Sequence, residues 1–210
     1  MLDDFEMIGI FPCPIYVARR DSILDSTEEK EIEDIIKEGL HKDGDLGYHS
    51  NNSHIFDTKL KNLKEFCEQH IKNYVKEIIT PKEELDFYIT QSWLNVVEPG
   101  GSIHRHWHAN SIISGVFYPT VEEDDQIHFQ TPNARLKERM FFEAMEYNPW
   151  NSSDSFFAAE KNNLMLFPSW LEHSVRPNEK ATRDRISISF NVFVRGIIGT
   201  ERTLDELILK

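Results

Sequence analysis

The chain has 210 residues and a formal net charge of −13 at pH 7, from 23 Lys and Arg against 36 Asp and Glu. That balance argues against nucleic acid as a partner, because a phosphate-binding surface needs a basic stripe, and it disfavours anionic membranes for the same reason. Hydrophobic residues make up 40% of the chain, with 14 Phe, which is enough for a real core. We therefore expect one domain over residues 1–210.

The two cysteines, Cys13 and Cys67, form no CxxC pair. They are typical of reduced thiols in an intracellular protein and not of a disulfide framework. The first residues are acidic and lack the basic and apolar regions of a signal peptide. No apolar run approaches the roughly 18 residues of a membrane span. The sequence thus predicts a soluble cytoplasmic protein.

Residues 1–84 are predicted to form a helical support region. Met7–Val17 carries two prolines, which suits an edge strand or an extended arm because proline cannot donate to a ladder. Ser26–Glu29 has a capping-box pattern and predicts a helix of about four turns that ends near Gly39 or Lys42.

A polar, glycine-containing stretch, residues 44–53, is predicted to be a loop. After it, Asp57 or Thr58 is expected to cap a stronger amphipathic helix, in which apolar residues recur at helical spacing. Pro81 is expected to stop that helix. His70 lies on this helix and is interpreted as an ordinary helix histidine.

From Leu85 onward the hydrophobic period changes to two, which predicts strands. The candidate strands are Phe87–Val97, Ile103–His108, Ile112–Tyr118, Gln126–Gln130, Ser155–Ala159, Asn163–Phe167, His173–Arg176 and Arg185–Val194. Turn signals separate most of them, including one at Pro99–Gly101. This spacing favours an antiparallel sandwich or barrel over βαβ units, so residues 85–196 are predicted to form a β core.

Two further stretches interrupt or follow that core. Residues 131–154 are long for a structureless connection and predict an insertion, which is either a lid or substrate loop or a surface segment that touches nothing. The C-terminal sequence TLDELILK predicts at most a last helical turn.

Three of the nine histidines lie within five residues, at positions 104, 106 and 108. If this stretch is extended, His104, His106 and His108 project from one face of a strand. Alternating imidazoles can converge on a metal without backbone distortion. The alternative is a polar strand face wetted by solvent.

A second cluster contains His173 and a strand that opens with Arg185. On that strand Arg185, Ser187 and Ser189 share one face, and a guanidinium beside hydroxyls is suited to a carboxylate. Arg183 is the competing cation, but it precedes the strand and is expected to be solvated.

Together, WLNVVEPGG…HRHWHANSIISGVFY and LMLFPSWLEHSVRPN…RISISFNV resemble the 2-oxoglutarate/iron(II)-dependent oxygenase superfamily. The resemblance is closest to a bacterial and phage group with the pattern HxH…SGVYY…FPSWLxH…RISISFN. It covers residues 11–14 and 87–194. It implies a double-stranded β-helix (a cupin-like jelly roll) with N-terminal helices packed on one sheet, which agrees with the helix-then-strand order.

Carried over by position, the resemblance makes His106 the first metal ligand and His173 the distal one. His108 stands where the wider superfamily has Asp or Glu. That departure matters, because non-heme iron(II) oxygenases use two histidines and one carboxylate, whereas three neutral imidazoles also suit Zn(II), Ni(II) or Cu(II). The pair His104 and His106 would serve equally well as the HxH motif.

For the cosubstrate, the resemblance implies that Arg185 pairs with the far carboxylate of 2-oxoglutarate, with Ser187 or Ser189 beside it. Asn95 and Tyr118, on neighbouring strands, are further candidates for this pocket.

The implied activity is that of an Fe(II)- and 2-oxoglutarate-dependent hydroxylase, which couples decarboxylation of 2-oxoglutarate to C–H oxidation of an unknown small-molecule or peptide substrate. Enzymes of this type are often homodimers. Two alternatives stay open: a three-histidine cupin-type metalloenzyme that works without 2-oxoglutarate, and a non-catalytic metal-binding jelly-roll module.

Overall fold

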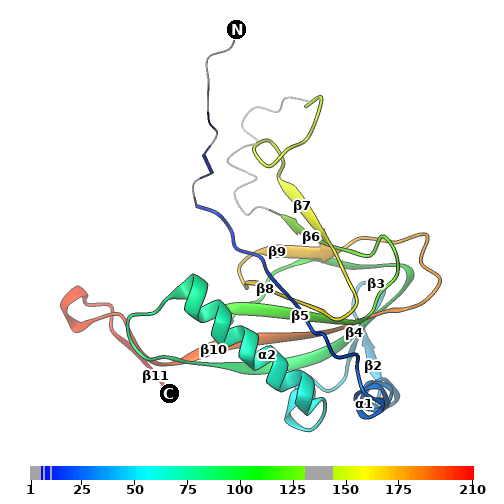
Figure 1. Cartoon of the computed structure of the whole chain (residues 1–210), viewed down its shortest axis with the longest axis horizontal. Coiled ribbons are helices and arrows are strands. Elements are labelled where there is room, and N and C mark those ends of the chain that lie inside the picture. The colour runs from blue at the N-terminus through cyan, green and yellow to red at the C-terminus, as the bar shows by residue number, and fades with distance from the viewer. Residues whose placement is uncertain (1–5, 7, 10, 131–143) are drawn as a thin grey trace.

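The structure is a computed structural model, and it describes residue 6, residues 8–9, residues 11–130 and residues 144–210. Within these residues the chain is mostly antiparallel strand, with two α-helices and a few short helical turns (Figure 1). No helix in the described part of the chain is long and apolar enough to cross a membrane. The mainly β fold predicted from the sequence is confirmed.

The first helix, α1, spans Ser26–Lys37, and its N-cap lies one residue earlier than predicted. Asp25 is the N-cap: its carboxylate accepts from the Thr27 and Glu28 backbone N–H groups, and the Glu28 side chain accepts from the Asp25 N–H. The capping box is therefore Asp25–Glu28 and not Ser26–Glu29. The helix ends at Lys37, ahead of Gly39, whose φ of +117° a side chain would disfavour.

The second helix, α2, spans Lys61–Tyr74 and runs on as a π-turn over Val75–Ile79. Its N-cap is Leu60, in the left-handed region with φ 58°, and not Asp57 or Thr58. Asp57 instead closes a 3₁₀ turn. Four residues on one face of α2 are buried and fix the helix on the sheet: Leu63, Cys67, Ile71 and Tyr74.

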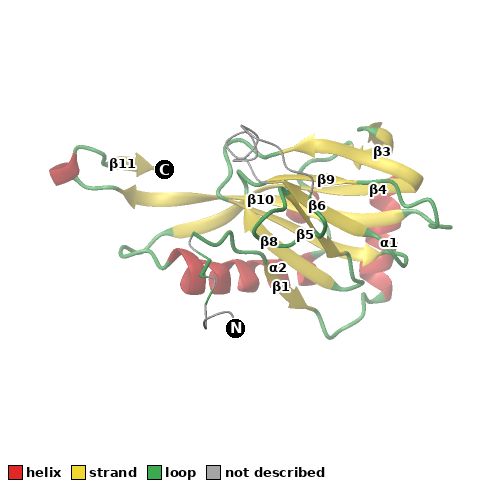
Figure 2. Ribbon diagram, turned by 90° about the horizontal axis from the view of Figure 1, so that it is seen from above, coloured by secondary structure: helices red, strands yellow, loops and turns green. Residues whose placement is uncertain are grey.

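The larger sheet contains seven strands within the described residues. In spatial order they are β1 (Tyr16–Arg19), β8 (Asn163–Pro168), β5 (Ile113–Thr120), β10 (Arg185–Ile198), the first half of β4 (Asp86–His106), β3 (Asp45–Ser50) and β2 (Leu40–Lys42). Both helices lie on one face of it (Figure 2). β1 forms one edge, and the predicted edge strand or arm over Met7–Val17 overlaps it only at Tyr16 and Val17, because Pro12 and Pro14 lie before the strand.

The prediction of a loop over residues 44–53 was wrong, because β2 and β3 form a hairpin there. His41 pairs with His49, and β3 continues the sheet by pairing with β4. Gly44, with φ +91°, lies in the connection, and a Cβ there would meet the Ser102 carbonyl oxygen at 2.5 Å. The hairpin forms one wall of the cavity described below.

The predicted turn at Pro99–Gly101 does not separate two strands, because β4 is one strand from Asp86 to His106, although its pairing with β3 is irregular between Val97 and Ser102 and Gly100 has a φ of +72°. Its first half pairs with β10 and β3, and its last residues pair with β9. β4 therefore leaves the larger sheet and enters a smaller one. That smaller sheet has the order β4, β9 (Glu172–Val175), β6 (Gln126–Gln130) and β7 (Asp154–Ala158).

Two apolar clusters match this layered arrangement. One lies between the helices and the outer face of the larger sheet and includes Ile71, Phe117 and Phe190. The other includes Tyr118, Phe129 and Phe167, from strands of both sheets. Two sheets that share a strand and enclose apolar side chains form a jelly-roll core.

Two predicted segments lie at the edges of the core, and the structure tests only the second. The predicted insertion begins with residues 131–143, which lie outside the described residues. At the C-terminus the chain forms a short 3₁₀ turn, Glu201–Thr203, and then a strand, β11 (Leu207–Leu209), instead of a final helical turn. β11 pairs with the end of β10 in an arm that extends from the body (Figures 1 and 2).

Candidate active site

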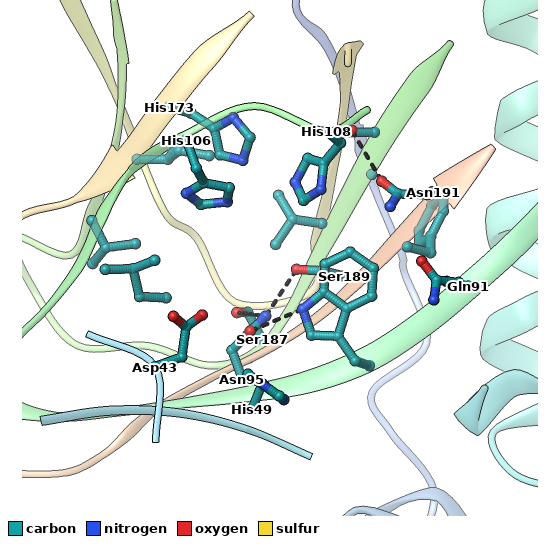
Figure 3. Close-up of a pocket in the computed structure, with 18 of the residues that line it drawn as sticks. Asp43, His49, Gln91, Asn95, His106, His108, His173, Ser187, Ser189 and Asn191 are labelled. Carbon is teal, nitrogen blue, oxygen red and sulfur yellow. Dashed lines mark hydrogen bonds between the residues drawn. The ribbon is translucent and has the colours of Figure 1, made fainter. Parts of the chain in front are cut away.

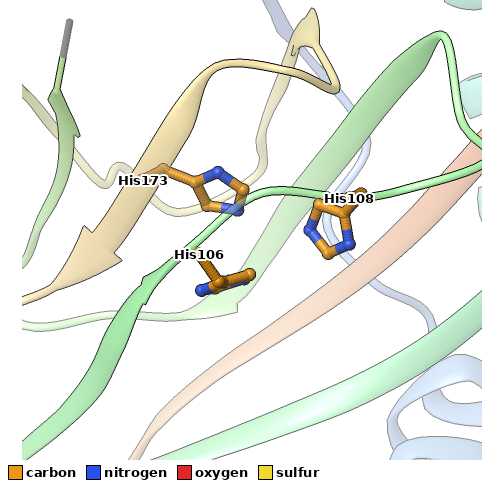
Figure 4. Close-up of side chains that lie close together, drawn as sticks. All are labelled: His106, His108 and His173. Atoms are coloured by element: carbon orange, nitrogen blue, oxygen red, sulfur yellow. The ribbon is translucent and has the colours of Figure 1, made fainter. Parts of the chain in front are cut away.

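His106, His108 and His173 converge between the two sheets, with ligand atoms all within 4.8 Å of one another (Figure 4). His106 ends β4 and is the direct cross-strand partner of His173 on β9. Their ring centroids are 4.3 Å apart, and the His108 ring lies 5.1 Å from His106 and 5.2 Å from His173. Three imidazoles at this separation can share one metal ion.

Backbone contacts select the ligand atom of two of these rings. His106 Nδ1 lies 2.8 Å from the His104 carbonyl oxygen, and His173 Nδ1 lies 3.0 Å from the Leu171 carbonyl oxygen. A carbonyl only accepts, so both rings carry their proton on Nδ1 and leave Nε2 free for a metal. His108 is fixed through its backbone N–H, which donates to the Ser169 carbonyl oxygen at 3.0 Å.

The three histidines are held in the neutral form that binds metals. Burial, reinforced by the neighbouring histidines, lowers the pKa of His108 to about 4 and that of His173 to about 3. Burial also lowers the pKa of His106. Near neutral pH a metal therefore displaces no proton from these rings.

The sequence left open whether His104 or His108 joins His106 in the HxH motif, and the structure distinguishes the two. His104 lies outside the group of three: its Nδ1 is 3.6 Å from an Asp43 carboxylate oxygen, and its side chain is 63% exposed. His108 joins the group although it lies two residues beyond the end of β4. Among the described residues, the group contains no carboxylate.

A cavity of about 490 Å³ opens beside the three histidines and is lined by the inner face of the larger sheet (Figure 3). Alternate residues of β10 face it, because side chains on a strand alternate between the two faces. Arg185, Ser187, Ser189 and Asn191 all line it, while Ile188 packs in the core behind. All eight residues predicted for the site line this one cavity: Asn95, His106, His108, Tyr118, His173, Arg185, Ser187 and Ser189.

Arg185 is 5% exposed and has an unused donor. Its Nη1 donates to the Gln126 carbonyl oxygen at 2.8 Å, and its guanidinium carbon lies 5.1 Å from the centre of the Tyr118 ring. Within the described part of the chain, its Nε and the Tyr118 hydroxyl are both buried without a hydrogen-bond partner. Burial raises the pKa of Tyr118, so the hydroxyl keeps its proton and can donate. An unpaired N–H of the guanidinium and an unpaired hydroxyl next to it are suited to binding a carboxylate.

Asn95 connects the other predicted cosubstrate residues. Its Nδ2 donates to Ser189 Oγ at 2.9 Å and lies 3.4 Å from Ser187 Oγ, and its Oδ1 accepts from Trp93 Nε1 at 3.0 Å. The Trp93 ring lies 5.6 Å from the His108 ring. This network fixes the floor of the cavity between Arg185 and the histidines.

Two charged residues near the site in sequence, Arg183 and Glu172, do not line the cavity. Arg183, whose side chain is 69% exposed, pairs with Glu122 at 2.7 Å, as expected for a solvated cation. Glu172 pairs with Arg105. Sequence reasoning missed Gln91 and Asn191, which also line the cavity. Continuing the alternation of β10 two residues past Ser189 would have found Asn191.

Comparison with known proteins supplies the family. Residues 91–191 match the model of the family described as "Putative 2OG-Fe(II) oxygenase". This segment belongs to the 2OG-Fe(II) oxygenase family. The chain is thus an oxidoreductase, and the family uses Fe(II) and 2-oxoglutarate. No curated protein matches the chain.

Three solved structures that share the fold are distant in sequence. A Pseudomonas putida prolyl-4-hydroxylase is 14% identical, with a TM-score of 0.53, and the match covers 86% of this chain and 93% of that one. A Trichoplax adhaerens prolyl hydroxylase in complex with a hypoxia-inducible-factor peptide is 14% identical, with a TM-score of 0.57 and coverage of 85% and 83%. The carbocyclase SnoK from nogalamycin biosynthesis is 13% identical, with a TM-score of 0.58 and coverage of 87% and 79%. These matches confirm the jelly-roll fold.

Proposed function

We propose that the oxygenase domain is a hydroxylase that binds Fe(II) through His106, His108 and His173 and couples decarboxylation of 2-oxoglutarate to C–H oxidation of a small-molecule or peptide substrate. The proposal rests on two features that occur in one cavity. One is a group of three imidazoles, each with a ring nitrogen available to a metal, and the other is a buried arginine with an unused hydrogen-bond donor.

The metal part rests on the donor set. Three protein ligands on one side of an ion leave the remaining positions of an octahedral site open for a chelating cosubstrate and oxygen. A closed four-ligand site would instead favour a structural metal. Because all three ligands are neutral, they compensate none of the metal's charge, and the two negative charges of 2-oxoglutarate become more important for a stable complex than in a site with a carboxylate ligand.

The cosubstrate part rests on Arg185 and Tyr118. An unpaired guanidinium in a buried site is costly, and a ligand carboxylate that accepts from Arg185 Nε and the Tyr118 hydroxyl removes that cost. Ser187 and Ser189 continue along the same strand face toward the histidines. A dicarboxylate with one end at Arg185 and its keto-acid end directed toward the histidines matches this order of residues.

When bound, iron and 2-oxoglutarate supply the chemistry, which is oxidative decarboxylation to succinate and CO₂ with transfer of one oxygen atom to the substrate. The protein's own part is orientation and exclusion of water. Arg185 sets the direction of the cosubstrate, and the Asn95 network holds the cavity floor. Val116, Ile127 and Phe167 give the cavity an apolar lining, and the Phe167 ring lies 4.9 Å from the His173 ring.

The test is oxygen-dependent conversion of 2-oxoglutarate to succinate by Fe(II)-loaded protein, with succinate quantified. The assay is run on the enzyme alone, where slow turnover of the cosubstrate is expected. His173→Ala should abolish it, while Glu172→Ala, a neighbouring change on the opposite strand face, should retain it. Succinate formation that is equal in the wild type and His173→Ala would refute the assignment of the metal ligands.

The competing metalloenzyme that works without 2-oxoglutarate makes a different prediction. Oxygen consumption would proceed without the cosubstrate, and Arg185 would be dispensable. The burial of Arg185 at the cavity end, with an unsatisfied Nε, argues against that alternative because nothing else in the described structure uses the charge.

A further inference from the structure

The cavity extends past the histidines to an end that the cosubstrate does not reach. Arg185 and Asn191 both face it from β10, and six residues of strand span about 20 Å. A five-carbon dicarboxylate covers roughly 7 Å at extended-chain dimensions. If Arg185 holds one carboxylate, as the proposed function requires, the Asn191 end is left for the substrate to be oxidised.

That far end is built from neutral hydrogen-bonding groups. Asn191 is 7% exposed and is the direct cross-strand partner of Gln91 on β4 and of Ser114 on β5. Ser114 Oγ donates to Asn191 Oδ1 at 3.3 Å and lies 2.9 Å from Ser169 Oγ. The Asn191 amide is thereby held from behind, with its Nδ2 without a hydrogen-bond partner in the described residues and turned to the cavity beside His108 (Figure 3).

The same end is free of charge. Among the described residues that line the cavity, Arg185 is the one Lys or Arg and Asp43 the one Asp or Glu. Arg185 belongs to the opposite end, and Asp43 lies by His104 on the hairpin side. A charged substrate group at Asn191 would lose its hydration without gaining a counter-ion, whereas a neutral group with a carbonyl and an N–H would be matched.

We infer that Asn191 and Gln91 form a substrate subsite for an uncharged amide, such as a peptide bond or a carboxamide, with Asn191 Nδ2 donating to its carbonyl oxygen. Asn191 is the fixed member, because it is buried and held by Ser114. Gln91 is exposed and can rotate its amide to present either a donor or an acceptor. Trp93, between this pair and Asn95 on the same face of β4, gives the amide plane an aromatic neighbour.

The experiment uses three small probes of similar size and different charge: N-acetylglycinamide, which is neutral, glycinamide, which is cationic, and N-acetylglycine, which is anionic. Each is titrated to 100 mM into Zn(II)-loaded, 2-oxoglutarate-saturated protein, while the side-chain amide signals of Asn191 and Gln91 are followed by NMR. We expect saturable binding of N-acetylglycinamide, shifts of both side-chain signals, and affinity at least about tenfold weaker for either charged probe.

Variants separate the subsite from general binding. Asn191→Leu should weaken N-acetylglycinamide by about fivefold or more, in line with one lost hydrogen bond. Asn191→Asp keeps the shape of the side chain and should reverse the preference, so that glycinamide binds more tightly than the neutral probe. Gln69→Leu, on the exposed face of α2, is the matched control and should change nothing.

The inference is overturned if N-acetylglycinamide fails to saturate, if a charged probe binds as tightly, or if Asn191→Leu binds like the wild type. Failure of the proposed function gives a different result, because 2-oxoglutarate binding is measured first in the same sample. If 2-oxoglutarate does not bind while the neutral probe does, the amide subsite stands and the cosubstrate assignment falls.

Discussion

Replacing Arg185 with Met should weaken 2-oxoglutarate binding by at least about 30-fold without unfolding the protein. In the structure the guanidinium is buried at 5% exposure with an unsatisfied Nε, and the described side chains offer it no counter-ion. Removing it would leave a bound carboxylate buried and unpaired, which costs about 2–5 kcal/mol, or a 30-fold to several-thousand-fold loss of affinity. Because the charge is unpaired when no cosubstrate is bound, Arg185→Met should itself be at least as stable as the wild type.

Thermal unfolding of Zn(II)-loaded protein measures both effects. At 100 times its Kd, 2-oxoglutarate should stabilise the wild type by about 2.7 kcal/mol, which is roughly 5–11 °C in Tm for a chain of this length. At the same concentration, a 30-fold weaker Arg185→Met should gain less than about 1 kcal/mol, or roughly 3 °C. Arg183→Met, two residues away and solvated, is the control and should respond like the wild type. An equal shift in Arg185→Met would refute the role assigned to Arg185.

Three further changes test the metal ligands and the fold. His173→Ala should lower metal affinity more than about 100-fold, which exceeds the effect of losing an orienting contact alone, whereas His104→Ala should bind metal as the wild type does. Calorimetric titration with Zn(II) measures both affinities. A larger loss of affinity for His104→Ala would reverse the ligand assignment. Gly115→Ala places a Cβ 2.2 Å from the Phe190 ring, so it should cost about 1–3 kcal/mol and lower Tm by roughly 2–12 °C; an unchanged Tm would contradict the packing. Asp25→Ala removes the N-cap of α1 and should cost about 1 kcal/mol in urea unfolding, whereas Ser26→Ala, at the cap position first predicted, should cost less.

The parts of the fold that follow from local burial were readable from the sequence. The apolar stripe of α2 and the alternation of β10 are set by which side chains face the core, and that period survives in the sequence. The same alternation placed Arg185, Ser187 and Ser189 on one face, and the structure has all three in the cavity. His106 and His173 come together because β4 pairs with β9. The hydrophobic pattern does not show this pairing, and only the resemblance to the oxygenase superfamily predicted it.

The errors lie where tertiary pairing overrides local signals. Pro99, Gly100 and Gly101 indicate a turn, yet β4 continues through them, because a Cβ at Gly101 would meet the Leu46 carbonyl oxygen at 2.7 Å and glycine permits this close approach of β3. The β2–β3 hairpin is polar because it lies at the sheet edge, so its hydrophobic period is weak. The N-cap of α2 is Leu60 in a left-handed conformation, and leucine is not a residue type from which such a cap can be predicted.

The measurement that tests the central claim most directly is anaerobic titration of 2-oxoglutarate into Fe(II)-loaded protein, followed by calorimetry and by visible absorption. We predict saturable binding, together with a metal-to-ligand charge-transfer band that is absent without iron and is lost in His173→Ala. Tight Fe(II) binding with neither the band nor heat from 2-oxoglutarate would contradict the account and favour a three-histidine site that works without this cosubstrate.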